Sequence, residues 1–231
     1  MTQPQVTSTR LYLIRHGEAY CNVEPIIGGM EGDAGLTERG RDQAHRLRDR
    51  LAATGEIKAD VLIGSTFPRA RQTAEIIAPA LRLPITWDDE VQEMRPGDAD
   101  ALDLTTFRER YGIPDFDADP YRPLAPGGES WATFMERVQR ALTRLAKEHR
   151  GRTVVIVCHG GVIDGSLLHF IGMPIVPRAA VQFDTHNTSI TLWEERRRDD
   201  RPTRWRLKRY NDDEHLHDNP AHPPLDWGDA F

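Results

Sequence analysis

The sequence predicts an α/β protein, a three-layer α/β/α sandwich with a mostly parallel central sheet. Two observations support this fold class: short apolar runs have the length of buried strands, and stretches with helical periodicity separate them. Strands that alternate with helices form βαβ units, whose parallel strands are covered by helices on both faces. The predicted strands are Arg10–Ile14, Asp60–Gly64, Pro84–Trp87 and Thr153–Cys158.

Four helices are predicted from apolar side chains that repeat on one face. Thr37 and Ser130 have the side chains of N-cap residues, and each precedes such a stripe. Another helix begins at about Arg69, and a fourth begins near Gly161. The fourth ends at Gly172-Met173-Pro174, because glycine commonly terminates a helix and proline cannot continue one.

Two parts of the chain interrupt this alternation within what is otherwise one predicted domain, residues 1–231. Residues 94–130 are rich in proline and aspartate, so we expect an irregular insertion that forms a small lid, with a short helix at about Leu104–Tyr111. Near the C-terminus, Ser189–Glu194 and Thr203–Tyr210 alternate like the strands of a hairpin. Residues 211–231 are rich in Asp, His and Pro, and we expect an irregular tail.

Length and composition exclude several classes of protein. The 231 residues suffice for a complete hydrophobic core. No apolar run reaches the ~18 to 20 residues that span a bilayer. The formal net charge of −6 argues against a general nucleic-acid-binding protein. Residues 1–10 lack the apolar segment of a secretory leader, so we expect a cytoplasmic protein in which Cys21 and Cys158 are reduced. The oligomeric state is open, and a homodimer is compatible with the sequence.

Two histidine–glycine sequences directly follow predicted strands. Arg15-His16-Gly17 follows the first strand, and His159-Gly160-Gly161 follows the fourth. Open α/β sheets bind ligands at the carboxyl ends of their strands, often against helix N-termini that favour anions. With an arginine beside the first histidine, this pattern predicts a site for a phosphate group.

Further short sequences occur in a fixed order along the chain. Asn22 lies six residues after His16, and three more stretches separate it from His159. These stretches are Leu36-Thr37-Glu38-Arg39-Gly40, Ser65-Thr66-Phe67-Pro68-Arg69-Ala70-Arg71-Gln72-Thr73-Ala74 and Pro126-Gly127-Gly128-Glu129-Ser130. Over about residues 10–195, the ordered set resembles the histidine phosphatase superfamily, which has the phosphoglycerate-mutase-like fold. The resemblance implies phosphoryl transfer through a phosphohistidine.

The residue types suit this chemistry. A phosphoryl group in transfer spreads negative charge over three oxygens, which Arg15 and Arg69 can bind with forked, permanently charged donors. His159 and Asn22 can supply further donors. A neutral imidazole nitrogen can attack phosphorus near pH 7, which makes His16 the candidate nucleophile.

The resemblance implies two further roles. The backbone next to the first histidine, here Gly17, would fix the imidazole tautomer, and a carboxylic acid after the second arginine's helix would protonate the leaving oxygen. Glu93 occupies the matching position. Some branches of the family carry the acid directly after the second histidine. Gly160 stands there in this chain, which favours Glu93 as the acid and leaves Gly160 as a substrate-binding residue.

The predicted function is metal-independent hydrolysis of a phosphomonoester, a small phosphorylated metabolite, without a cofactor. Two alternatives stay open: a phosphoglycerate mutase that uses the same phosphohistidine, and a phospholigand-binding module without catalysis. A cysteine phosphatase needs an arginine six residues after its nucleophile, where Cys158 has Asp164 and Cys21 has Ile27. No P-loop sequence and no ligand spacing typical of a closed zinc site occurs in the chain.

Overall fold

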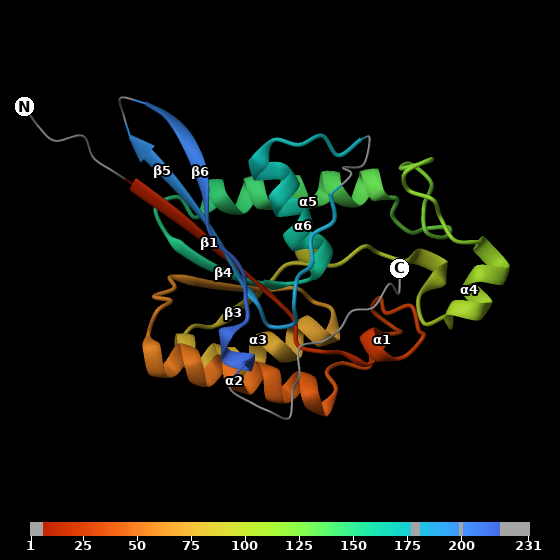
Figure 1. Cartoon of the computed structure of the whole chain (residues 1–231), viewed down its shortest axis with the longest axis horizontal. Coiled ribbons are helices and arrows are strands. Elements are labelled where there is room, and N and C mark those ends of the chain that lie inside the picture. Colours follow the sequence, from red (N-terminus) through yellow and green to blue (C-terminus); the bar gives the residue numbers. More distant parts are fainter. Residues whose placement is uncertain (1–6, 177–180, 199–200, 218–231) are drawn as a thin grey trace, which may run out of the picture.

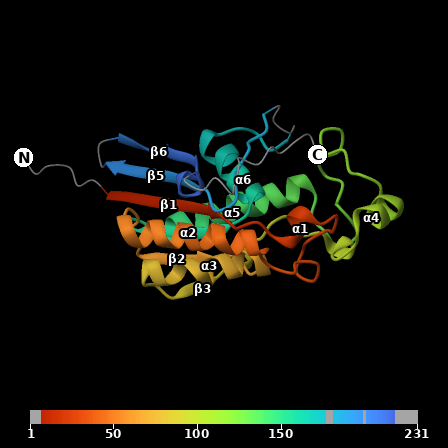
Figure 2. The same cartoon turned by 60° about the horizontal axis from the view of Figure 1, so that its bottom comes forward.

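The protein is built around a central sheet. The computed structural model describes residues 7–176, 181–198 and 201–217. Within these residues the sheet has six strands in the order β3-β2-β4-β1-β5-β6; Figure 1 labels five of them, and Figure 2 labels β2. Neighbours among the first four strands of this order run parallel, and the last two strands form an antiparallel hairpin beside β1. The strands are β1 (Thr7–Arg15), β2 (Val61–Gly64), β3 (Ile85–Trp87), β4 (Thr153–Cys158), β5 (Ile190–Arg198) and β6 (Arg201–Asp212). The predicted strands and hairpin are confirmed.

Helices cover both faces of the sheet (Figures 1 and 2). One face carries α2 (Glu38–Thr54) and α3 (Pro68–Leu81), and the other carries α5 (Trp131–Glu148) and α6 (Gly160–Ile171). Side chains alternate across a strand, so β1 contributes to both layers. Leu11 and Leu13 pack in the core with α5 and α6, whereas Tyr12 and Ile14 pack with α2 and α3. The three-layer sandwich is confirmed.

The helix boundaries follow from the capping residues. The Thr37 hydroxyl accepts the Gly40 N–H, and the Ser130 hydroxyl accepts the Thr133 N–H. Gly172 ends α6 with a φ of 80°, a left-handed conformation that glycine adopts without strain. These positions agree with the predicted helices. None of the helices within the described ranges is both long and apolar enough to cross a membrane.

Residues 94–130 form an irregular insertion at one end of the molecule, beyond the short helix α1 (Tyr20–Val23) (Figure 2). The insertion contains the predicted short helix, α4 (Leu104–Tyr111), and its own small core around Phe107. It is fastened to a glycine-rich loop, residues 27–33, because the Asp100 carboxylate accepts the N–H groups of Gly29, Glu31 and Gly32. The loop and the insertion therefore form one structural unit. Its role as a lid stays a prediction.

The predicted irregular tail, residues 211–231, is wrong in its first part. β6 continues to Asp212, and a 3-10 turn at Glu214–Leu216 follows. Long-range contacts order this segment: Arg50 of α2 binds the Asp212 carboxylate through two nitrogens at 2.8 and 2.9 Å, and His215 lies 2.9 Å from the Thr188 hydroxyl. Local composition cannot show such contacts. Residues 218–231 lie outside the described residues.

Candidate active site

The two strand-end histidines lie next to each other. β1 and β4 are parallel neighbours, and their register pairs Arg15 with Cys158. The residue after each strand is therefore a histidine at the same edge of the sheet. The rings of His16 and His159 are 5.2 Å apart, and both side chains are buried.

The hydrogen bonds of His16 define its tautomer. Its Nδ1 lies 2.7 Å from the Gly17 carbonyl oxygen, which can only accept, so Nδ1 carries the proton. The opposite nitrogen, Nε2, accepts a hydrogen bond of 3.2 Å from Arg69 Nε. The ring thus presents an unprotonated Nε2 toward an arginine, as a nucleophile in phosphoryl transfer requires.

Burial and positive charge keep both imidazoles neutral. Desolvation lowers the pKa of His16 well below its ordinary value of 6.5, and Arg69 and Arg15 lower it further. The pKa of His159 is lowered well below the same value by burial and then by Arg69. A neutral His16 keeps its nucleophilic lone pair across the range in which an exposed histidine gains a proton.

Arg69 is fixed in the pocket from the first turn of α3. Its Nη1 donates to the buried Asp33 carboxylate and to the Gly28 carbonyl, both at 2.9 Å, and its backbone N–H donates to Asp33 at 3.0 Å. The nearby Arg71 instead points to the surface, where it pairs with Glu75. The prediction of Arg69 as the pocket arginine agrees with this geometry. Asp33 was not predicted as a site residue.

Arg15 is half-buried and acts on the same pocket histidine as Arg69. Its Nη1 donates to the Thr185 carbonyl. Burial lowers the pKa of its guanidinium, which the Glu93 and Asp164 carboxyls raise in turn. Gly160 lies alongside, because a Cβ added there would be 3.7 Å from Arg15 Nε, an ordinary contact.

His159 has one hydrogen-bonded and one open ring nitrogen. Its Nε2 lies 2.8 Å from the hydroxyl of Ser65, the residue directly after β2. Its Nδ1 is buried and has no hydrogen-bond partner within the described part of the chain. Ser65 was not predicted as a site residue, although its position at a strand's carboxyl end, like that of both histidines, was the available signal.

Glu93 lies at the N-terminus of α6. One carboxylate oxygen accepts the Gly161 N–H at 3.0 Å, and the other accepts the Met94 N–H at 3.1 Å. Among the charged groups that shift the pKa of Arg15, the Glu93 carboxyl has the largest effect, and it raises that pKa. The hydrogen bond from Gly161 places the carboxyl group at the edge of the pocket, beside the second histidine–glycine sequence.

Asn22 is bound locally in this structure. Its side-chain oxygen accepts the Ala19 N–H at 3.0 Å and thereby caps α1, a helix that the sequence did not predict. This contact uses the oxygen and leaves the side-chain NH₂ group as the possible donor to a ligand. The role of Asn22 in binding a phosphoryl group stays a prediction.

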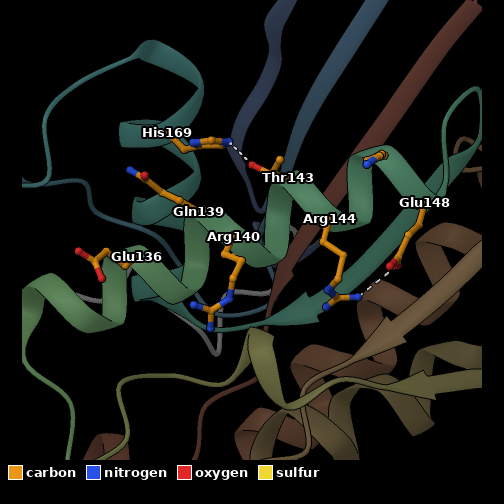
Figure 3. Close-up of a pocket in the computed structure, with 8 residues that line it drawn as sticks. Glu136, Gln139, Arg140, Thr143, Arg144, Glu148 and His169 are labelled. Carbon is orange, nitrogen blue, oxygen red and sulfur yellow. Dashed lines mark hydrogen bonds and ion pairs between the residues drawn. The ribbon is translucent and has the colours of Figure 1, made fainter.

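An open groove lies away from this pocket, on α5 and α6 (Figure 3). Polar side chains line it, including Arg140, Arg144 and His169. Arg144 pairs with Glu148 on the same helix, and Thr143 lies 3.1 Å from His169. The groove contains none of the strand-end residues.

The sandwich fold and the paired histidine–arginine pocket define a class of phosphoryl-transfer proteins. The chain belongs to the histidine phosphatase superfamily, since the model of its branch 1 matches residues 11–213. An adenosylcobalamin/α-ribazole phosphatase of Escherichia coli is 30% identical over 173 residues, 71% of this chain and 80% of that protein. A probable phosphoglycerate mutase, GpmB, of Salmonella paratyphi C is 30% identical over 167 residues, 71% and 76%.

Solved structures agree with the fold. A phosphoserine phosphatase from Entamoeba histolytica, crystallised with 3-phosphoglyceric acid, superimposes with a TM-score of 0.72 at 26% identity, covering 90% of this chain and 99% of that one. The protein YhfR of Bacillus stearothermophilus has the same TM-score at 31% identity, covering 90% and 98%.

Proposed function

We propose that this chain hydrolyses a small phosphomonoester through a phosphohistidine on His16. The observation that carries the proposal is the unprotonated Nε2 of His16, which is held by the Gly17 carbonyl on one side and faces Arg69 on the other. Relatives at 30% identity carry names of phosphomonoester chemistry, which supports the same reaction class. The non-catalytic alternative is disfavoured because nucleophile, arginines and acid are all present.

The first step is transfer of the phosphoryl group to the enzyme. Arg15, Arg69 and the Nδ1–H of His159 would bind its oxygens, and His16 Nε2 would attack phosphorus opposite the leaving oxygen. The bond from phosphorus to the leaving oxygen breaks as the new P–N bond forms. The Gly17 carbonyl accepts the Nδ1–H of the imidazole that becomes positively charged.

The second step returns the enzyme to its free form. Glu93, which gives its proton to the leaving oxygen in the first step, would then take a proton from water. The resulting nucleophile attacks phosphorus, the P–N bond breaks, and His16 regains its lone pair while phosphate departs. One carboxyl group thus serves as acid and then as base.

The test is replacement of His16. We expect H16A to lose about 10³-fold or more of the turnover of p-nitrophenyl phosphate, measured with EDTA present. The wild-type protein, quenched during turnover, should carry an acid-labile, alkali-stable phosphoryl group that H16A lacks. H45A removes an exposed histidine of α2 and should retain full activity. Unchanged turnover by H16A would refute the proposal.

A phosphoglycerate mutase is the second candidate, because several relatives at 30% identity carry that name. Both reactions form the phosphohistidine, and they differ in whether the phosphoryl group goes to water or back to the substrate. A coupled assay of 3-phosphoglycerate to 2-phosphoglycerate conversion separates them. We expect slow or no conversion, and efficient conversion without release of phosphate would establish the mutase.

A further inference from the structure

The segment that carries Glu93 has little regular secondary structure of its own. A single 3-10 turn, Asp89–Val91, precedes Glu93, and the chain continues without helix or strand to Pro96. A catalytic carboxyl group must nevertheless be held to within about 0.5 Å of its working position. Contacts from another part of the molecule are therefore needed to fix this segment, beyond the hydrogen bonds that Arg95 makes within it.

A buried arginine of α5 supplies them. Arg137 is 3% exposed, and its Nη1 donates to the carbonyl oxygens of Glu90 and Gln92, both at 2.9 Å. Its Nη2 donates to the carbonyl oxygen of Glu93 itself, at 3.1 Å. The guanidinium thus binds three carbonyl groups within four consecutive residues, the last of them that of Glu93.

Glu129, which directly precedes the N-cap residue of α5, completes the arrangement. Its two carboxylate oxygens accept Arg137 Nε and Nη2, each at 2.6 Å. It also binds the chain just beyond Glu93, since its carboxylate accepts the Arg95 N–H at 2.9 Å and its own N–H donates to the Arg95 carbonyl at 2.8 Å. The five N–H groups of the Arg137 guanidinium all have acceptors, and only arginine offers five such donors in a fixed plane.

We propose that Arg137 and Glu129 are positioning residues for Glu93, which they hold at the edge of the phosphoryl pocket. The inference rests on the proposed role of Glu93 as acid and base. Within the described part of the chain, the side-chain hydrogen bonds of Arg137 and Glu129 go to residues 90–95 and to each other, and none joins them to His16, His159, Arg15 or Arg69. Their effect passes through the backbone of residues 90–95, so a weakened pair should misplace the carboxyl group while His16 and Arg69 stay in position.

A misplaced acid has a specific kinetic signature. An alkoxide leaves only when it receives a proton, whereas p-nitrophenolate leaves without one. The value of kcat/KM reports the steps up to departure of the leaving group, so it is sensitive to this proton transfer. Loss of acid catalysis therefore makes kcat/KM fall more steeply along a series from p-nitrophenyl phosphate to alkyl phosphates.

The experiment measures that series for E93Q, R137K and E129Q. We expect E93Q to lose about 100-fold on alkyl phosphates and much less on p-nitrophenyl phosphate. R137K and E129Q should show the same pattern with about tenfold loss on alkyl phosphates, and R137K should add no further loss in the E93Q background. R140A is the matched control: Arg140 lies on the same helix and pairs with Glu90 of the same segment, but at the surface, in the groove of Figure 3.

The outcomes separate the two proposals. If E93Q loses the same factor on every substrate, Glu93 is not the acid, and both the proposed mechanism and this inference fail. If E93Q shows the expected slope but R137K and E129Q lose the same factor across the series, the pair is merely structural and the inference alone is overturned. Should R137K fail to fold, judged by circular dichroism, E129Q decides, since it keeps the shape of the side chain.

Discussion

At the scale of single residues, the chemistry of the pocket depends on where each buried imidazole carries its proton. The Gly17 carbonyl places the proton of His16 on Nδ1, because a carbonyl cannot donate. His159 faces a hydroxyl group, which can donate or accept. A phosphoryl oxygen only accepts, so a bound phosphoryl group requires Nδ1–H on His159 and a Ser65 hydroxyl that donates to Nε2.

Replacement of Ser65 by alanine tests this assignment. We expect S65A to lower kcat/KM for p-nitrophenyl phosphate by about tenfold to 100-fold, because loss of one hydrogen bond to a buried group corresponds to about 1–3 kcal/mol. Inhibition by inorganic phosphate should weaken in parallel. S166A is the control, since Ser166 is an equally buried, hydrogen-bonded serine on α6 whose partners are Ile163 and Trp193. Equal kinetics for S65A and S166A would contradict the assignment.

The sequence predicts which strand-end residues meet in the pocket better than it predicts the residues that hold them in place. His16, His159 and Arg15 are predictable because they follow apolar strands, and parallel register brings strand ends together. Asp33 and the Arg137–Glu129 pair are not predictable in this way. Each acts through a contact between distant parts of the chain. The sequence alone does not distinguish a charged side chain that is buried and paired from one that is exposed to solvent.

At the scale of secondary structure, the N-terminus of α6 combines a histidine, two glycines and the proposed acid. The glycines differ in the space around them. A Cβ at position 160 would make only ordinary contact with Arg15. A Cβ at position 161 would overlap the Glu93 carboxylate and lie 2.8 Å from the Phe134 ring.

Alanine substitutions at these adjacent positions should therefore have different effects. We expect G161A to lower kcat/KM by tenfold or more, because Glu93 must leave its place and overpacking against Phe134 destabilises by about 1–3 kcal/mol. G160A should lose much less, since a Cβ at this first position of α6 meets no overlap. Steady-state kinetics and thermal unfolding of both variants provide the measurement. A larger loss of kcat/KM in G160A than in G161A would show that glycine is not required at position 161 to leave space for Glu93.

The helices and strands also differ in how well the sequence predicts them. Periodicity and capping residues predicted the long helices, and Ser130 and Thr37 cap them as expected. The helix α1 has only four residues and depends on Asn22, so no periodicity could indicate it. The end of β6 is ordered by Arg50 from α2, a contact between segments that are far apart in the sequence.

At the scale of the whole molecule, the pocket concentrates polar groups that a hydrophobic core would exclude. The insertion contributes indirectly: Asp100 fixes the loop of residues 27–33, and that loop supplies Gly28 and Asp33 to Arg69. A chain of contacts thus runs from the predicted lid to the arginine that faces the proposed nucleophile, His16. The substrate that this end of the molecule admits is the least predictable property, since the insertion lacks regular patterning.

The two buried histidines of the pocket should also make the folded protein less stable in acid. The pKa values of His16 and His159 lie well below 6.5 in the folded chain, because burial and the pocket arginines oppose their protonation. In the unfolded chain both imidazoles take up protons near their ordinary pKa of about 6.5. The unfolded state therefore binds more protons as pH falls below that value, and the free energy of unfolding must decrease.

The two histidines together should lower the free energy of unfolding by up to about 3 kcal/mol at one pH unit below 6.5, since each contributes up to about 1.4 kcal/mol per unit. Urea unfolding of the wild type between pH 7.5 and about 5 measures this decrease. We expect a shallower slope for H16Q/H159Q, whatever its stability at neutral pH. His215, whose pKa burial lowers to about 4, acts in the same direction but is present in both proteins. Parallel curves for the two proteins would mean that the pocket imidazoles gain protons as easily in the folded chain as in the unfolded one.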